Sequence, residues 1–335
     1  MAIYGTIVPN FNTSFRNLLI NGDMSVWQKG TSGNTSGASV VSDMFSIESR
    51  NSTTINWAQS TDVPAGEGFS YSMRIYATNS TDDGCHWKKA VELGGTGNYS
   101  KFAAGKKFVL SYWAKSAYSN RTINPTLLLS NSTTGHTAYS QSVTSNEGTA
   151  TLTTTWQKFT HTYTMPTWTA DTGSLSNVTM LYIRFLQGSD NTSQDTYITG
   201  IQFEEGTVAT PFEFRPIQTE TALCQRYYFR VVDTDGVTEQ IVMWGLASNS
   251  AQVNFVPPVV PMFGRPSVSI TNTAPYWESS PWGTAGVSSS GVTVTNGHFG
   301  RSGYDILVSG TFNPTLTRAI NYTIEANIFI LSSEL

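Results

Sequence analysis

The fold of this chain follows most directly from the stretch Ile201-Gln-Phe-Glu-Glu-Gly-Thr-Val-Ala-Thr-Pro-Phe-Glu-Phe-Arg-Pro-Ile-Gln-Thr-Glu-Thr-Ala-Leu-Cys-Gln-Arg-Tyr-Tyr228, here called the junction segment. It begins as a β-strand, and Gly206 then permits a turn. Pro211 and Pro216 bias the residues before them toward extended geometry, which predicts a stiff connection. The residue types after Pro216 favour a short helix. The junction segment therefore predicts a boundary between two β-rich units, and none of its residues suggests catalysis.

Short runs of strand-forming residues recur on both sides of the junction segment, and clusters of Gly, Asn, Asp and Ser separate them. Two runs alternate with a period of two, so one face of each is expected to seal a core: Phe108, Leu110, Tyr112 and Ala114 in the first, and Leu181, Ile183 and Phe185 in the second. No stretch before residue 206 sustains a helical period. The pattern indicates an all-β protein.

We expect two antiparallel, jelly-roll-like β-sandwich domains joined by a short linker with a helical turn. The predicted parts are an N-terminal arm (1–16), a first β-sandwich domain (17–206), the linker and short helix (207–228), and a C-terminal β-sandwich (229–335). In this last part, the alternating run 321–331 predicts one long strand. Residues 271–290, rich in Ser, Gly, Pro and Trp, predict a long surface loop.

Charge and hydropathy exclude several classes of partner. Charged residues make up 13% of the 335 residues, against roughly 25% in typical soluble domains. The net charge is −4 and no run of Lys or Arg occurs, so we expect no nucleic-acid partner. No apolar run approaches the roughly 20 residues that cross a bilayer, and the N-terminus has no signal-peptide pattern. We expect no membrane insertion.

The two cysteines, Cys85 and Cys224, lie far apart in the sequence and form no CxxC pair. Two buried free thiols are expected, although the sequence leaves open whether the two residues meet.

Several segments resemble parts of bacteriophage virion proteins. The run Asn17-Leu-Leu-Ile-Asn-Gly-Asp-Met-Ser-Val-Trp-Gln-Lys-Gly30 looks like the opening strand of a domain found in phage tail fibres. Later segments resemble strands of jelly-roll carbohydrate-binding modules: 108–116, 156–166 and 197–206. Others are similar to the region that follows such a module in phage fibres: 209–216, 223–228 and 256–268, the last with a Pro-Met-x-x-x-Pro pattern. Together these segments span nearly the whole chain.

The resemblance implies a virion protein, often a homotrimer, that binds a host-surface glycan or another virion component. In such a protein, residues 17–206 would form a jelly-roll carbohydrate-binding-like domain, and the C-terminal β-sandwich (229–335) would serve oligomerisation. Such a protein is assembled in the bacterial cytoplasm and released by lysis. Tail fibres usually carry a long N-terminal anchor and shaft, whereas only about 16 residues precede the first expected domain here. A tail fibre, another host-attachment adhesin, and a capsid decoration or head-fibre protein therefore stay open.

Sequence patterns for catalysis are absent. The chain has no Gly-x-Ser-x-Gly elbow, no Walker loop and no paired histidines that would indicate zinc. The adjacent carboxylates Glu204 and Glu205 should point to opposite faces of a strand, which does not suit glycoside hydrolysis. We therefore expect no enzyme; a polysaccharide-degrading tailspike, which would carry β-helix repeats, and a free-standing lectin are the alternatives.

Calcium is the one cofactor with some support in the sequence. Asp190 and Asp195 lie in one loop rich in oxygen ligands, and jelly-roll carbohydrate modules often hold structural calcium. Asp and Asn are also common in plain turns, which is the alternative.

A glycan site needs aromatic platforms with polar neighbours, because sugar rings stack their C–H faces on aromatic rings. The candidates are Trp113, Tyr182, Arg184, Trp57 and Trp87, with core packing as the alternative for each Trp. On the predicted long loop, Tyr276, Trp277 and Trp282 are expected to contact a neighbouring subunit or a host receptor, since exposed aromatic clusters indicate contacts.

Overall fold

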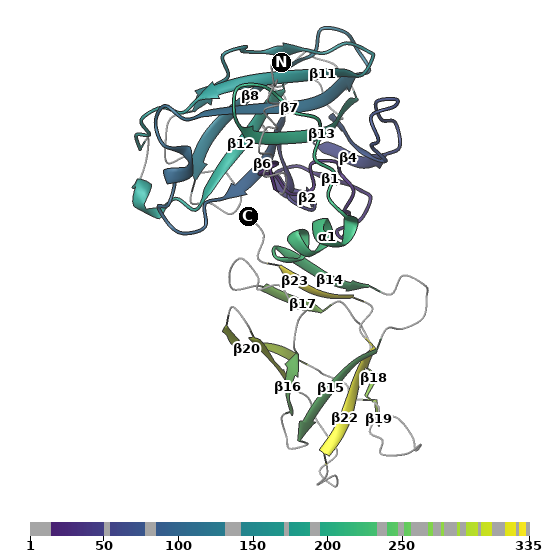
Figure 1. Cartoon of the computed structure of the whole chain (residues 1–335). Coiled ribbons are helices and arrows are strands. Elements are labelled where there is room, and N and C mark those ends of the chain that lie inside the picture. Colours follow the sequence, from purple (N-terminus) through teal and green to yellow (C-terminus); the bar gives the residue numbers. More distant parts are fainter. Residues whose placement is uncertain are drawn as a thin grey trace, which may run out of the picture. The chain divides into compact units, whose positions relative to one another are not determined.

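The computed structural model describes residues 15–49, 54–77, 85–130, 142–170, 174–187, 195–232, 240–246, 251–255, 267–270, 276–277, 287–288, 293–300, 303–309, 319–325 and 328–332; from residue 230 on, it describes the backbone alone. The chain divides into two compact units (Figure 1). The first unit contains Met1–Ser25 and Gly30–Pro216, and the second contains Val26–Lys29 and Ile217–Leu335. Residues 207–216, which the sequence places in a linker, therefore lie in the first unit.

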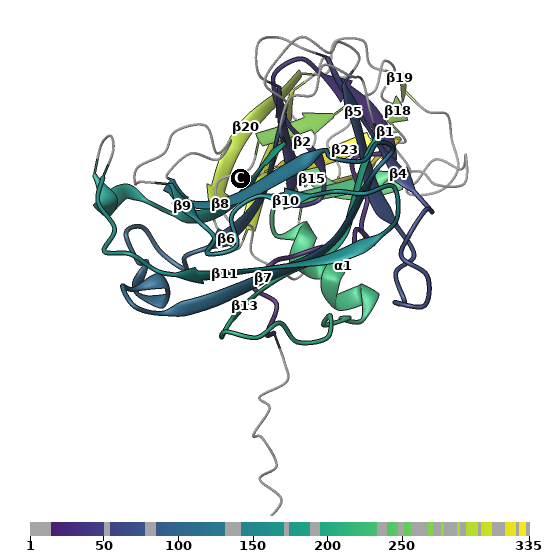
Figure 2. The same ribbon diagram turned by 90° about the horizontal axis from the view of Figure 1, so that it is seen from above.

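The first unit contains two antiparallel sheets. The six-stranded sheet has the order β1 (Ser32–Thr35), β4 (Ile55–Ser60), β5 (Ser72–Ala77), β13 (Thr196–Glu205), β7 (Lys107–Ser116) and β11 (Gln157–Thr164). The seven-stranded sheet has the order β10 (Ala150–Thr151), β8 (Thr122–Ser130), β12 (Met180–Gln187), β6 (Cys85–Glu92), β3 (Phe45–Ser49) and β2 (Ala38–Ser42), with β9 (Val143–Thr144) paired to β8. Figure 2 shows β7, β11 and β13 running together in the first of these sheets.

Side chains of both sheets meet in one core. The ring centroids of Tyr112 on β7 and Phe185 on β12 lie 5.3 Å apart, nearly perpendicular to one another. All seven residues predicted to face inward from β7 and β12 are fully buried, which confirms the predicted core-facing sides of these strands. Short 3-10 helices at Ser100–Phe102 and Leu175–Asn177 lie between strands. The all-β, sandwich-like fold predicted from the sequence is confirmed.

Residues 17–30, predicted to contain an opening strand, form no strand. Polar groups hold residues 17–25 along β13 instead. The Asn17 side-chain amide donates to Ile201 O at 3.0 Å, and its oxygen accepts from Phe203 N at 3.0 Å and Leu19 N at 3.1 Å. Gly22 lies so close to β13 that a Cβ atom there would come within 2.2 Å of Ile201 O, so only glycine fits.

Residues 207–216, here called the strap, also bind this segment. The Glu213 carboxylate accepts from Phe15 N and Asn17 N, each at 2.7 Å. The Arg215 guanidinium donates to Leu19 O at 3.1 Å and to Asn17 O. Glu213 and Arg215 also form an ion pair with each other, and their side chains are 10% and 8% exposed, respectively. The N-terminal segment is thereby joined by hydrogen bonds to β13 and to the strap, which lie almost 200 residues further along the chain.

A polar cluster lies inside the first unit around His161. Its Nε2 lies 3.1 Å from the Tyr112 hydroxyl, and its Nδ1 lies 2.9 Å from Ser145 Oγ. Burial lowers the pKa of His161 to about 4, although nearby Glu147 opposes the shift. The imidazole is therefore neutral at physiological pH and stabilises the interior as a hydrogen-bonding group.

In the described part of the second unit, the helix α1 (Ile217–Gln225) is followed by antiparallel strands. Three strands pair as β14 (Tyr228–Val232), β23 (Ile328–Ser332) and β17 (Ser267–Ile270), and three as β16 (Ala251–Phe255), β21 (Gly303–Ser309) and β20 (Thr293–Gly300). Two further pairs are β15 (Gln240–Leu246) with β22 (Ala319–Glu325), and β18 (Tyr276–Trp277) with β19 (Val287–Ser288).

Two predictions for this unit are wrong in detail. The expected single strand 321–331 is divided between β22 and β23, because the two parts pair with different partners, β15 and β14. The expected loop 271–290 contains the short pair β18 and β19. No helix in the described part of the chain is long and apolar enough to cross a membrane.

We expect Asn17→Ala to lower the free energy of unfolding by about 2–4 kcal/mol, because it leaves buried backbone N–H and C=O groups without partners. Asn146→Ala is the matched control: its exposed side chain donates one bond, to Thr162 Oγ1, so a loss of about 0.5 kcal/mol or less is expected. Urea unfolding measures both variants. Equal losses in the two would show that the contacts of Asn17 do not hold the fold.

The lowered pKa of His161 predicts how stability changes with pH. The unfolded state binds a proton below about pH 6.5, whereas the folded state resists protonation down to about pH 4. Stability from this residue is thus fully present above about pH 6.5 and is lost as the pH falls toward 4. His161→Gln should flatten this part of the calorimetric stability profile. His86, whose pKa burial also lowers, leaves a residual slope; an unchanged profile in the variant would contradict the assignment.

Candidate functional site

The outward face of the six-stranded sheet presents polar and aromatic side chains. On β7, Ser111, Trp113 and Lys115 alternate with the buried residues of the core. The register places Lys158 of β11 directly beside Trp113, and Thr199 of β13 on its other side. Since neighbouring strands lie about 4.8 Å apart, Trp113 and Lys158 lie side by side on this face, whereas Ser111 and Thr199 are themselves buried, at 3% and 0% exposure.

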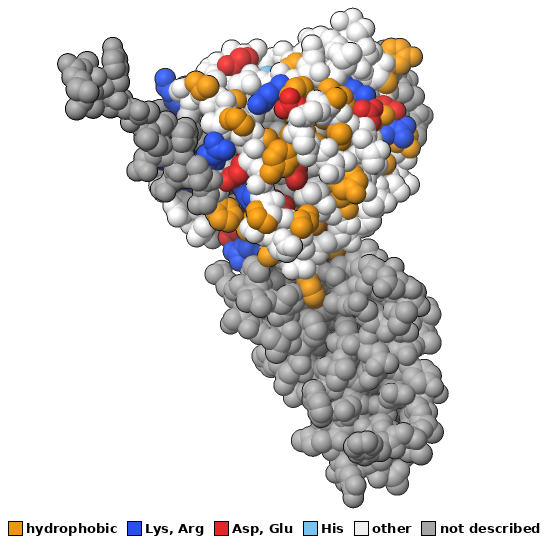
Figure 3. Space-filling view, turned by 45° about the vertical axis from the view of Figure 1, so that its right-hand side comes forward, with side chains coloured by type: hydrophobic (Ala, Val, Ile, Leu, Met, Phe, Trp, Pro, Cys, Tyr) orange, Lys and Arg blue, Asp and Glu red, His pale blue; other side chains and the backbone are white. Residues whose placement is uncertain are grey.

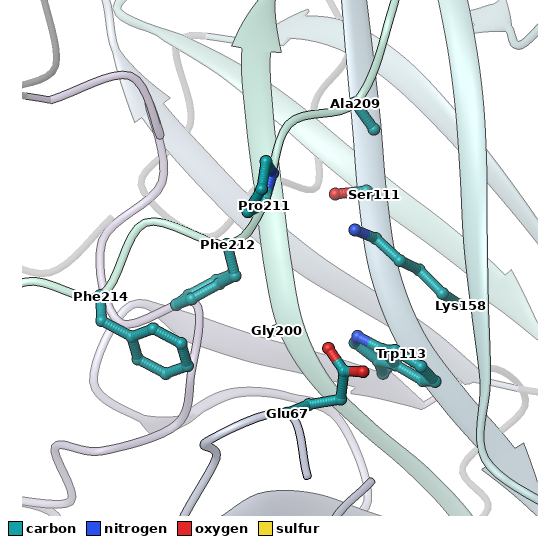
Figure 4. A pocket seen from close by; sticks show the side chains of 9 residues that line it. All are labelled: Glu67, Ser111, Trp113, Lys158, Gly200, Ala209, Pro211, Phe212 and Phe214. Atoms are coloured by element: carbon teal, nitrogen blue, oxygen red, sulfur yellow. The ribbon is translucent and has the colours of Figure 1, made fainter.

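A pocket of about 380 Å³ opens on this surface. Its lining consists of Glu67, Ser111, Trp113, Lys158, Gly200, Ala209, Pro211, Phe212 and Phe214. Figure 4 shows that the residues come from three sources: neighbouring strands of the sheet, the loop that carries Glu67, and the strap. The pocket is therefore bounded by sheet and strap, and Trp113 lies in its sheet-side wall.

Aromatic packing positions the strap beside the sheet. The rings of Phe212 and Phe214 lie 4.8 Å apart, and each lies close to the ring of Phe69, at 5.1 and 5.2 Å. The Phe69 ring in turn occupies the space beside Gly200, where a Cβ atom would meet it at 2.5 Å. Gly200 has φ +61° and lies in the β-bulge of β13. The bulge and the missing side chain let this cluster approach the sheet.

Hydrogen bonds from β13 fix the path of the strap. Glu204 accepts from the backbone N–H of Thr210 at 2.9 Å and from its hydroxyl at 2.7 Å. The side-chain oxygen of Gln202 accepts from Glu213 N at 2.8 Å, and its amide nitrogen donates to Pro211 O at 3.3 Å. Gln202 and Glu204 are buried, so these bonds are shielded from water.

A second group of outward side chains lies next to the pocket along β7. Lys115 forms an ion pair with Asp62, and its ammonium lies 5.5 Å from the ring centroid of Trp156 and 4.9 Å from that of Tyr197. Trp156 Nε1 donates to Asp62 at 2.9 Å. Burial raises the pKa of Asp62, but the bonds from Lys115 and Trp156 outweigh it and leave the pKa lowered. The charges of Lys115 and Asp62 in this group are therefore paired with each other.

The residues that the sequence predicts as a glycan-binding platform do not lie together in the structure. Trp113 lines the pocket. Trp87 and Tyr182 are 0% and 1% exposed, and Trp57 is 8% exposed. The prediction of a ligand-facing surface is wrong for these three, because the rings are enclosed by the folded unit. Arg184 is half-buried on β12, where it bonds to Thr126 and Ser142, and the structure does not bring it to the pocket.

The predicted calcium ligands are not brought together in the described residues. Asp190 lies outside them. The carboxylate of Asp195 forms an ion pair with Arg74 at 2.9 Å and accepts from the Tyr197 hydroxyl at 3.3 Å. Within the described ranges, no group of three or more His, Cys, Asp or Glu side chains could hold a metal ion. Calcium binding stays a prediction.

Other predicted positions can be located only in part. Tyr276 and Trp277 form β18, of which the backbone alone is described, and Trp282 lies outside the described residues. Cys85 and Cys224 are both buried free thiols, which confirms the expectation. Burial raises the pKa of Cys85 to about 12, so its thiol is unreactive.

Sequence reasoning missed most of the pocket. Lys158 gave a signal in the sequence, since it lies in a predicted strand on the face opposite Phe159. Glu67 and Phe212 gave none, because their proximity to Trp113 depends on the loop and the strap. On the face in Figure 3, the described surface is mainly neither charged nor hydrophobic, with separate hydrophobic side chains and few charged ones. Composition alone therefore did not mark the site.

No protein-family model matches the chain, and no curated protein matches it in sequence. Among solved structures, it is similar to the enzymatically active domain of tailspike protein 4 of bacteriophage CBA120, with 16% identity and a TM-score of 0.33; the match covers 57% of this chain and 22% of that one. It is also similar to a family 22 carbohydrate-binding module of Clostridium thermocellum Xyn10B, with 17% identity and a TM-score of 0.34, covering 50% and 89%.

A third similar structure is a family 11 carbohydrate-binding module of Clostridium thermocellum in complex with a β-1,3-1,4-mixed-linked tetrasaccharide. The identity is 15% and the TM-score 0.32, and the match covers 52% of this chain and 99% of that one. At such identities and TM-scores, these neighbours say nothing about the ligand or activity of this chain. Its site has to be interpreted from its own geometry.

Proposed function

We propose that the first unit binds a glycan in the pocket beside Trp113. The observation that carries this proposal is the combination of a half-buried Trp ring with three polar side chains in one cavity: Ser111, Lys158 and Glu67. An aromatic ring can stack on the C–H face of a sugar, while the polar groups bond to its hydroxyls. The cavity volume of about 380 Å³ is at the small end of the range for ligand pockets.

Binding without hydrolysis is the form of this proposal that the pocket supports. Glycoside hydrolases use two carboxyl groups roughly 5–9.5 Å apart. Glu67 is the one carboxylate among the nine residues that line the pocket, and Glu204 is occupied by Thr210. The described residues of the pocket can therefore hold and orient a sugar, and they include no pair of carboxyl groups of the kind that cleaves one.

Trp113→Ala should weaken glycan binding about tenfold or more, because it removes the stacking surface and the area it buries. A glycan array identifies the bound polymer, and calorimetry then gives the affinity of each variant. Tyr118→Ala is the control, since Tyr118 is an exposed aromatic residue outside the pocket lining, and it should bind normally.

Two results would contradict this proposal: full affinity in the folded Trp113→Ala variant, or shortening of the polymer during incubation. The first would place the glycan elsewhere. The second would show hydrolysis.

We further propose that the chain is a homotrimeric bacteriophage virion protein that presents this pocket to a host-surface glycan. The sequence resemblance to phage fibres, the low charge content of 13% and the all-β fold support this. Electron microscopy of particles labelled with antibody fragments tests it directly: three fragments should cluster at each labelled position. Label at tail tips would support a fibre, label on the head a capsid decoration protein, and unlabelled particles would refute virion assembly.

A further inference from the structure

Two opposite charges, both on exposed side chains, face the pocket: those of Lys158 and Glu67. Within the described part of the chain, the side chains of Lys158 and Glu67 form no ion pair and no hydrogen bond. Other charged side chains of the first unit do pair, as Lys88 does with Glu48 and Lys115 with Asp62. The two charges at the pocket are therefore available to a ligand.

The two charged side chains reach the pocket from different sides of β7. Lys158 lies on β11, next to Trp113 on β7. Glu67 lies on the side of β13, because its loop places Phe69 against Gly200. β11 and β13 are the two neighbours of β7 in the six-stranded sheet. Figure 4 shows the Lys158 and Glu67 side chains approaching the pocket from different elements.

A ligand with a single charge would pair with either Lys158 or Glu67, and the other residue would then have no ion pair with the ligand. A neutral sugar would satisfy neither charge. A sugar that carries both an ammonium and an acidic group could pair with both while its ring lies on Trp113. Exposed ion pairs each change affinity by roughly 1.4- to 5-fold, so two together give a measurable preference.

We propose that the pocket selects a zwitterionic sugar, namely an amino sugar that also carries an acidic group. The acidic group pairs with Lys158, the ammonium pairs with Glu67, and the ring stacks on Trp113. This inference rests on the proposed glycan binding and adds the chemical class of the sugar.

Four monosaccharides separate the contributions: muramic acid carries both charges, N-acetylmuramic acid only the negative one, glucosamine only the positive one, and glucose none. Titrations of the full chain, followed by NMR, should show muramic acid binding about fivefold or more tighter than glucose, with the other two between them. Lys158→Met should reduce the affinity for muramic acid to that for glucosamine. Glu67→Gln should reduce it to that for N-acetylmuramic acid.

Lys101→Met, a change outside the pocket lining, is the matched control and should leave all four affinities unchanged. Equal affinities for glucose and muramic acid, or no binding of muramic acid, would overturn the inference. So would affinities that do not respond to Lys158→Met and Glu67→Gln. If neutral sugars still bind in a Trp113-dependent manner, the proposed function stands without this selectivity; if neither monosaccharides nor polymers bind, both fail.

Discussion

The hydrogen bonds between the Asn17 side chain and the backbone of β13 are the constraint on which the pocket depends. They fix residues 17–25 along β13, and the same segment binds Glu213 and Arg215 of the strap. The contacts of the Asn17 side chain are buried and those of Glu213 and Arg215 are partly buried, and each satisfies a backbone group that would otherwise lack a hydrogen-bond partner. The strap therefore cannot leave the sheet without breaking several bonds at once, and it supplies part of the pocket wall.

The strap and the sheet contribute different properties to the site. The strap supplies apolar rings, with Phe212 and Phe214 packed on Phe69 beside Gly200. The sheet supplies Trp113 and its neighbour Lys158, placed outward by the same alternation that buries Tyr112. An aromatic surface with polar groups at its edge is suited to a ring that has apolar faces and a polar rim, which is the shape of a sugar.

The sequence predicts those parts of the site that follow from the pattern within a single strand, and not those that depend on contacts between separate elements. The period-two pattern of β7 is local, so it predicts both the buried face and the outward position of Trp113. For Tyr182 the same pattern misleads, because the central strands of the seven-stranded sheet are buried on both faces: Ala90 and Leu128, beside Tyr182, are also enclosed. The path of the strap was not predictable, since it depends on bonds from Gln202 and Glu204 to residues several positions further on.

The central claim is that a sugar ring lies on Trp113, and the indole N–H resonances of the nine Trp residues test it most directly. In an NMR titration with a glycan fragment that binds, the account predicts a large shift of the Trp113 resonance and none for Trp87, which is buried in the core. Binding that leaves the Trp113 resonance unchanged and shifts that of another Trp would contradict the account.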